Sequence, residues 1–231
     1  MYFINSIKYS VVSVALLATT CADAYEPNGM YNEPCIASIH MHEGVIVRPP
    51  RGYVTMCDSG LFPCSSMMDP FQYENDLDNS TLTGEIRLNY DNEVIMVEGM
   101  WDLLSYANRK VNDMIEHVSD YQNYGVVDHW IPSIDKGDCE DYVLTKKLLL
   151  MKMGWPESSL MIAIARTQIS AYDYHAVLVV KTDQGDFVLD SANDVVSPWC
   201  EVGYNWVMRQ SERGTNNWVR IVNSVLVNSV Q

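Results

Sequence analysis

Residues 137–142 read Gly-Asp-Cys-Glu-Asp-Tyr and lead directly into an apolar run from Val143 to Met153. This run predicts a buried helix, with Gly137 interrupting the chain before it and Asp138 as its N-cap residue. Cys139 then lies in the first helical turn, where unpaired backbone N–H groups and the helix dipole favour a thiolate. A thiolate at this position is a nucleophile, and it needs a base.

His175 and Asp190 are the candidates for that base and for the acid that orients it. His175 opens one apolar strand pattern, Asp190 closes the next, and residues 182–185 join the two. A two-residue loop at 183–184 makes His175 and Asp190 diagonal neighbours on one face of a hairpin, whereas a loop at 184–185 moves them further apart. In the first register Asp190 fixes the tautomer of His175, which activates Cys139. The order Cys, His, Asp is typical of papain-like and transglutaminase-like thiol enzymes.

Each of these residues also has a structural interpretation. A single cysteine is most often a small buried hydrophobic residue. A histidine at a strand end is usually structural, and Asp190 precedes the turn-like stretch 191–193. The occurrence of all three, with acids on both sides of the cysteine, favours catalysis over these interpretations.

Three carboxylates flank the predicted nucleophile, at Asp138, Glu140 and Asp141. As like charges they raise the pKa of a neighbouring thiol and oppose the effect of the helix dipole. A divalent cation bound between them removes this conflict, and a set of oxygen ligands suits Ca2+ rather than Zn2+. The same acids also suit the N-cap and first turn of a helix, at the positive end of its dipole. The residues alone leave both interpretations open.

The order of the periodic segments predicts an α+β fold. From residue 95 to about residue 118, apolar residues recur at spacings of three and four, which indicates a helix. After the helix that begins at Cys139, the segments that read as strands are 160–166, 175–181, 187–190, 206–209 and 218–222. Helices followed by strands predict N-terminal helices packed on a mainly antiparallel sheet.

The chain divides into three predicted parts: a signal peptide at 1–24, a loop-rich extension at 25–94 and a core at 95–231. The signal is indicated by Lys8, the short apolar run 11–18 and the small-x-small pattern at 22–24. That apolar run is too short to span a membrane. We therefore expect a periplasmic or secreted protein with no stable membrane insertion. The net charge of −15 argues against nucleic acid and anionic membranes as partners.

The chain has six cysteines, and Cys21 leaves with the signal peptide. The five that remain form an odd number in an oxidising compartment, so two disulfides and one free thiol is the economical arrangement. We expect Cys57–Cys64 and Cys35–Cys200 as the disulfides, with Cys139 as the free thiol.

Several separate motifs resemble the bacterial transglutaminase-like cysteine proteinases. They are the stretch 137–142, Gly-Trp-Pro at 154–156, His-Ala-Val-Leu at 175–178 and Gly-Asp-Phe-Val-Leu-Asp at 185–190, with Asn108-Arg109, Asn112 and Asp128-His129-Trp130 upstream. The resemblance implies a papain-like fold, export to the periplasm, and a triad of Cys139 as nucleophile, His175 as base and Asp190 as orienting acid. Its best-known members are calcium-dependent proteases of surface adhesins, which implies Ca2+ at Asp138 and Glu140.

The first functional hypothesis is therefore a monomeric periplasmic thiol peptidase that acts on a protein or peptide, with Ca2+ as its candidate cofactor. A second is a transglutaminase or amidase, which forms the same acyl-enzyme and passes it to another acceptor. A third is a non-catalytic binding module that keeps the fold. The second oxyanion donor beside the Cys139 N–H is expected from Trp130 or Gln122.

Overall fold

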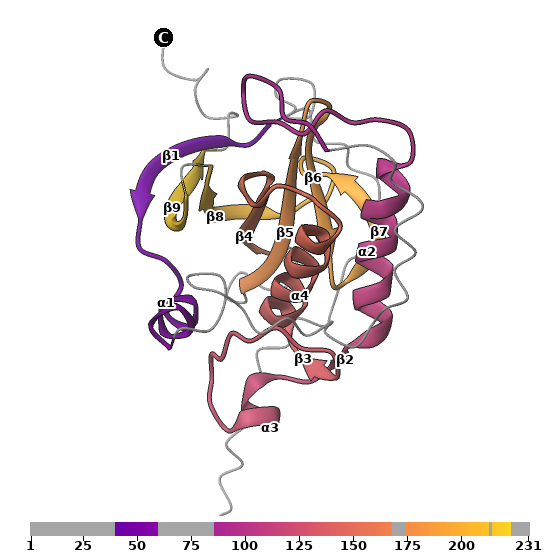
Figure 1. The fold of residues 1–231 in the computed structure, drawn as a ribbon. Helices are drawn as coiled ribbons and strands as arrows, with labels where there is room; N and C mark the ends of the chain where they lie inside the picture. The colour runs from indigo at the N-terminus through magenta and orange to yellow at the C-terminus, as the bar shows by residue number, and fades with distance from the viewer. Residues whose placement is uncertain (1–39, 60–85, 168–173, 213, 223–231) are drawn as a thin grey trace, which may run out of the picture.

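A seven-stranded antiparallel sheet forms the centre of the molecule, in the strand order β1-β9-β8-β4-β5-β6-β7 (Figure 1). The computed structural model describes residues 40–59, 86–167, 174–212 and 214–222. The strands are β1 His42–Val47, β4 Leu160–Arg166, β5 Tyr174–Thr182, β6 Gly185–Asp190, β7 Asn193–Pro198, β8 Asn205–Ser211 and β9 Gly214–Val222. A second, parallel pair joins β2 Glu116–His117 to β3 Lys136–Gly137. The predicted α+β class with a mainly antiparallel sheet is confirmed.

Two long helices pack against one face of this sheet. The helices of the described chain are α1 Arg51–Asp58, α2 Met100–Met114, α3 Asp120–Tyr124 and α4 Cys139–Lys152, with a 3-10 turn at Glu157–Ser159. In Figure 1, α4 lies over β5 and α2 lies beside it. This arrangement places the N-terminus of α4 and the start of β5 at the same end of the molecule.

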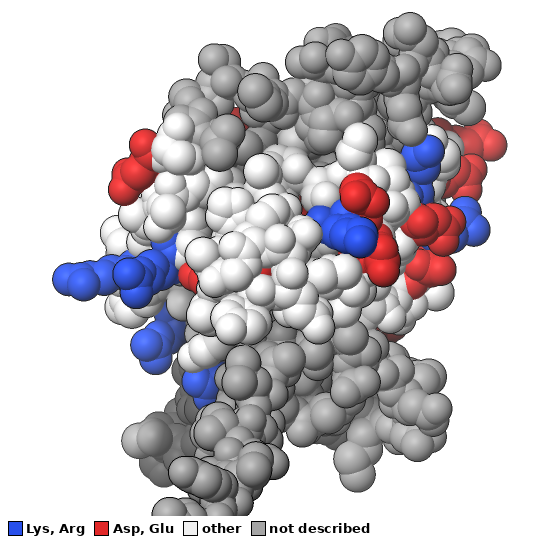
Figure 2. Space-filling view, turned by 90° about the horizontal axis from the view of Figure 1, so that it is seen from below, with Lys and Arg blue, Asp and Glu red and all other residues white. Residues whose placement is uncertain are grey.

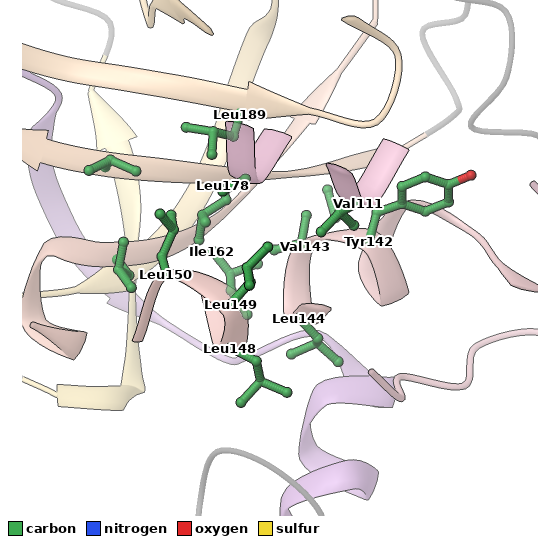
Figure 3. Close-up of a cluster of buried hydrophobic side chains, with 14 of the residues drawn as sticks. Val111, Tyr142, Val143, Leu144, Leu148, Leu149, Leu150, Ile162, Leu178 and Leu189 are labelled. Carbon is green, nitrogen blue, oxygen red and sulfur yellow. The ribbon is translucent and has the colours of Figure 1, made fainter. Parts of the chain in front are cut away.

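Helix α4 is buried along almost its whole length because its apolar residues face in every direction. Residues 139–150 are all buried. Figure 3 shows how Leu149 and Leu150 of α4 meet Ile162 and Leu178 of the sheet, while Val111 of α2 lies near the start of α4. Burying each such side chain stabilises the fold by about 1.5–3 kcal/mol. The helix that carries Cys139 is therefore a fixed part of the core.

The hairpin of β5 and β6 has the register that brings its two polar residues together. Thr182 pairs with Gly185 across a two-residue loop, and Leu178 pairs with Leu189. Gly185 has a φ of 120°, which favours glycine. Continued toward the open end, this register places Asp190 opposite residue 177 and diagonal to His175, as expected from a loop at 183–184.

Strand β7 and helix α1 were not predicted, whereas β1 falls within residues 36–47, where the sequence allows a short strand. Strand β7 begins at Asn193, directly after residues that read as a turn, and pairs with β6 at the edge of the sheet. In the segment predicted as a loop-rich extension, β1 pairs with β9 and α1 buries Tyr53 and Met56 in the core. Residues 42–58 are thus integral to the fold. No helix of the described chain is long and apolar enough to cross a membrane, and the predicted signal peptide lies outside the described residues.

Candidate active site

The start of α4 is fixed by contacts between its own first residues. Asp138 has the extended backbone expected of an N-cap residue, and its N–H donates to Asp141 Oδ2 at 3.3 Å. A Cβ at Gly137 would lie 2.3 Å from that same oxygen, so only glycine allows this approach. Cys139 follows as the first helical residue and is only 4% exposed. The predicted helix start at Cys139 is confirmed.

The state of the cysteines bears on the prediction of a free thiol. None of the cysteines in the described chain is free, and Cys57, Cys139 and Cys200 are each disulfide-bonded. Their partners lie outside the described residues, so the pairs Cys57–Cys64 and Cys35–Cys200 remain predictions. In this full-length chain Cys139 is not free. The expectation of a free thiol concerns the mature chain, which has five cysteines after signal removal rather than six, and it stays a prediction.

His175 and Asp190 form a buried pair. His175 Nε2 lies 2.7 Å from Asp190 Oδ1, and both side chains are at most 5% exposed. Tyr204 Oη donates to Asp190 Oδ2 at 2.5 Å, and the ring of Tyr204 meets the imidazole edge to face at 5.6 Å. The Ala192 N–H donates to Asp190 Oδ1 at 2.9 Å. The carboxylate thus holds the imidazole in one orientation, with Nε2 directed to the acid.

The ionisation of Asp190 fits this role. Burial alone would raise the pKa of Asp190, but the charge of His175 and the hydrogen bonds from His175, Tyr204 and the Ala192 N–H outweigh it and hold the pKa at about 2. Asp190 is therefore a carboxylate at any working pH. An anion at this position stabilises an imidazolium and selects the tautomer of a neutral imidazole.

The remaining nitrogen of His175 is available for chemistry. Nδ1 is buried and has no hydrogen-bond partner among the described residues. Cys139 and the two neighbours of His175 on β5, Tyr174 and Ala176, line one pocket. The Cys139 Sγ itself lies 3.2 Å from Glu140 Oε2 and makes no hydrogen bond to His175. The structure thus brings the three predicted residues to one region, with only His175 and Asp190 in direct contact.

A cluster of three buried carboxylates lies beside the nucleophile. One oxygen each from Asp120, Asp138 and Glu140 lies within 4.8 Å of the others. Asp120 Oδ1 and Asp138 Oδ1 are buried without a hydrogen-bond partner in the described structure. Buried oxygens without donors are costly, and a hard cation is the partner that satisfies several at once. The donor set therefore fits Ca2+.

The carboxylates of this cluster resist ionisation without a cation. Burial, followed by the charge of Asp138, raises the pKa of Asp120 to about 7. Burial and the adjacent Asp138 also raise the pKa of Glu140 well above its ordinary value. Like charges in a buried site repel, so without a counter-ion some of these groups hold protons.

Asp141, the third predicted metal ligand, has a different role in the structure. Its Oδ1 accepts from the Ile131 N–H at 3.0 Å and its Oδ2 accepts from the Asp138 N–H. Burial raises its pKa to about 9. These bonds tie the start of α4 to the preceding loop, and Asp120 takes the place in the cluster that the sequence suggested for Asp141.

Sequence reasoning missed Asp120 and Tyr204. Asp120 begins α3, and its Oδ2 accepts a short hydrogen bond from the His129 N–H. It lies 18 residues before Asp138, too far for a local motif. Tyr204 lies between β7 and β8, with no pattern linking it to Asp190. The indole N–H of Trp130 donates to Asp128 Oδ1 at 2.8 Å, and the second oxyanion donor, from Trp130 or Gln122, stays a prediction.

Comparison with known proteins identifies the family. Residues 65–225 match the family described as bacterial transglutaminase-like cysteine proteinase, over more than half of the 231-residue chain. The chain belongs to this family. The family that the sequence motifs resemble is thus confirmed, and the protein is a cysteine peptidase with a transglutaminase-like fold.

Solved structures of LapG from Legionella pneumophila are also similar to this proteinase. The calcium-bound form shares 22% identity at a TM-score of 0.43, covering 53% of this chain and 71% of that chain. The EGTA-treated form shares 23% identity at a TM-score of 0.43, covering 53% and 68%. No curated protein matches the chain.

Proposed function

We propose that this protein is an exported thiol peptidase in which Cys139, His175 and Asp190 act as a catalytic triad. The observation that carries the proposal is the buried His175–Asp190 pair with an unused Nδ1, together with a pocket lined by Cys139 and by Tyr174 and Ala176, the neighbours of His175 on β5. The Cys139 thiolate attacks a peptide carbonyl and forms a thioester, while His175 gives its proton to the leaving amine. Water, deprotonated by His175, then hydrolyses the thioester.

The proposal requires a reduced Cys139. A sulfur held in a disulfide has no lone thiolate with which to attack, so the active chain must carry Cys139 as a free thiol. The mechanism also requires this thiol to come within reach of His175 Nδ1. Activity should therefore rise when the purified protein is treated with a thiol reductant.

Ca2+ belongs to the proposal as a bound ion held by Asp120, Asp138 and Glu140. Support comes from the three converging oxygens and from the two buried oxygens without donors. When bound, the ion supplies positive charge beside Cys139 and so favours its thiolate. Asp138 and Glu140 then serve both the helix start and the cation, whereas Asp141 serves the helix alone.

The proposal is tested with a protein substrate and reduced, Ca2+-loaded protein. Wild type is expected to release new N-termini, and Cys139→Ala is expected to release none while retaining the wild-type melting temperature, because only a small side chain is removed. Cys200→Ala is the matched control, since Cys200 lies in the turn after β7 and does not line the pocket. Equal turnover by wild type and Cys139→Ala would refute the thiol mechanism.

Acyl transfer is the second candidate function, because a transglutaminase forms the same thioester. Adding a primary amine such as a labelled cadaverine to the same assay separates the two. Incorporation of the label into substrate glutamines, without new N-termini, would favour transfer. We expect new N-termini and no label at glutamine.

A further inference from the structure

The pocket beside Cys139 is a cavity of about 330 Å³ with a largely apolar lining. The apolar side chains that line it are Pro50, Val127, Trp130, Ile164, Ala176 and Met208. The other residues that line the pocket are Tyr174, Cys139 and the acidic residues Asp128, Asp138 and Glu140. A cavity of this size is at the lower end of those that accept a small molecule or a single large side chain.

One wall of the pocket comes from the N-terminal segment. Pro50 directly precedes α1, within the segment 42–58 that joins the sheet through β1. This segment lies before residue 65, where the match to the family begins. This part of the pocket lining therefore comes from residues before the matched range.

A single carboxylate fixes this wall. Asp128 Oδ2 accepts from the Gly52 N–H at 2.6 Å, and Asp128 Oδ1 accepts from the Trp130 Nε1–H at 2.8 Å. We call these two hydrogen bonds the Asp128 clamp. They link the start of α1 to the loop that carries Val127 and Trp130, and so connect the segments that carry three of the lining residues.

The clamp depends on a glycine and is anchored in the core. A Cβ at Gly52 would lie 2.3 Å from Asp128 Oδ1 and 2.4 Å from Trp130 Cδ1, so a larger residue would push the clamp apart. The next residue, Tyr53, is 1% exposed and meets the Trp130 ring edge to face at 5.5 Å. Its Oη accepts from Gln210 Nε2 on β8 at 2.9 Å.

Figure 2 views the molecule from below. White residues fill much of the area that is not grey, and charged residues lie on both sides of them, including a blue residue beside red ones near the middle. The net charge of the whole chain is −15. A chain this acidic repels an acidic stretch of substrate.

We propose that the pocket binds a large apolar side chain of the substrate next to the scissile bond, and that the Asp128 clamp sets the width of the pocket. This inference rests on the proposed thiol-peptidase function. Burying such a side chain among six apolar residues favours it over glycine by roughly 10- to 100-fold in rate, the range known for apolar pockets. An aspartate there would be buried without a partner and is disfavoured further.

Electrophilic peptides that differ in one side chain test the preference. Five peptidyl vinyl sulfones carrying Gly, Ala, Leu, Phe or Asp beside the warhead are reacted with reduced, Ca2+-loaded full-length protein, and labelling of Cys139 is followed by mass spectrometry. We expect Leu and Phe to react roughly 10- to 100-fold faster than Gly, and Asp to react slowest. Equal rates for all five would overturn the pocket assignment. No labelling of Cys139 by any probe would instead overturn the proposed function.

Two variants test the clamp, with the ratio of Leu to Gly labelling rates as the readout. Asp128→Asn keeps the shape but offers one acceptor oxygen for two donors, and we expect the ratio to fall at least threefold. Met208→Trp narrows the pocket without touching the clamp, and we expect a fall of similar size. Val54→Ala, on the exposed side of α1, is the control and should keep the wild-type ratio. An unchanged ratio in both pocket variants would overturn the role of these residues.

Discussion

The two halves of the active site differ in how many of their buried polar atoms have hydrogen-bond partners within the protein. The His175–Asp190 half is closed: the carboxylate accepts from Tyr204 and from a backbone N–H, and the pKa of Asp190 is held at about 2. The Cys139 half is open, because its carboxylates include buried oxygens without donors and its sulfur is bonded in a disulfide. The base is therefore organised by the fold itself, whereas the nucleophile depends on reduction and on a cation. Regulation of this proteinase should act on the Cys139 half.

The largest expected effect comes from removing the carboxylate of the His175–Asp190 half. Asp190→Asn removes the anion that orients His175 and should lower kcat by about 10³- to 10⁴-fold, the loss typical of amidating the acid of a triad. Steady-state kinetics on a peptide substrate measures this change.

Tyr204→Phe is the matched control for this comparison. It removes one of the hydrogen bonds to Asp190 and leaves the carboxylate in place, so kcat should fall by about tenfold or less. A loss in Asp190→Asn no greater than that in Tyr204→Phe would show that the pair does not orient the base.

The next prediction distinguishes two acids of the Cys139 half: Asp120, which we propose as a Ca2+ ligand, and Asp141, which stabilises the start of α4. Asp120→Asn should abolish high-affinity Ca2+ binding in calorimetry, because it removes one of three ligand carboxylates. Asp141→Ala should keep measurable Ca2+ binding but lose two hydrogen bonds at the start of α4. That loss should cost about 2–3 kcal/mol of unfolding free energy, measured by denaturant titration. Strong Ca2+ binding by Asp120→Asn would place the ion elsewhere.

The buried carboxylates of the Cys139 half should also make the folded chain less stable as pH rises when Ca2+ is absent. Asp120, with a pKa of about 7, and Asp141, with a pKa of about 9, bind protons more tightly in the folded chain than in the unfolded chain. Folding therefore takes up protons above about pH 4, and the resulting stability is lost as pH rises through these folded pKa values. Melting temperatures in EGTA should decrease from pH 5 to pH 9.

Added Ca2+ should flatten this dependence, since the bound cation favours the ionised carboxylates and is released when they are protonated. Calcium affinity should accordingly weaken as pH falls below about 7. Melting curves in EGTA that rise with pH would contradict the assignment of raised pKa values to this cluster.

The stability contributed by the His175–Asp190 half depends on pH in the opposite direction, and this is the smallest effect that we expect. The pKa of Asp190 is lower in the folded chain than its ordinary value of 3.8. Its contribution, on the order of 2 kcal/mol, is present above about pH 4 and is lost as pH falls toward 2. This contribution is measured by comparing the acid unfolding of Asp190→Asn with that of wild type. Parallel acid-unfolding curves for the two proteins would show that Asp190 makes no such contribution.

The sequence predicted the parts of the site that depend on local signals. The start of α4 follows from Asp138 and the apolar run after it, and the His175–Asp190 contact follows from a two-residue loop and the alternation of side chains. These features need only neighbouring residues, and the structure agrees with them.

The parts that depend on distant contacts could not be read from the sequence. Asp120 reaches the cluster because α3 folds back onto the start of α4, and β1 joins the sheet by pairing with β9, whose residues lie more than 170 positions later. No periodicity within either segment indicates such a partner.

The account depends most on the claim that His175 activates Cys139 once the disulfide is reduced. The most direct measurement is the rate of carbamidomethylation of Cys139 by iodoacetamide, followed by mass spectrometry from pH 4 to pH 10, in reduced, Ca2+-loaded wild type and His175→Ala. A thiolate paired with an imidazolium reacts well below the pH at which a free thiol ionises, near 8.5. We predict rapid labelling of wild type below pH 7 and a shift of the His175→Ala profile toward pH 8.5 or above. Identical pH profiles for the two proteins would contradict the account.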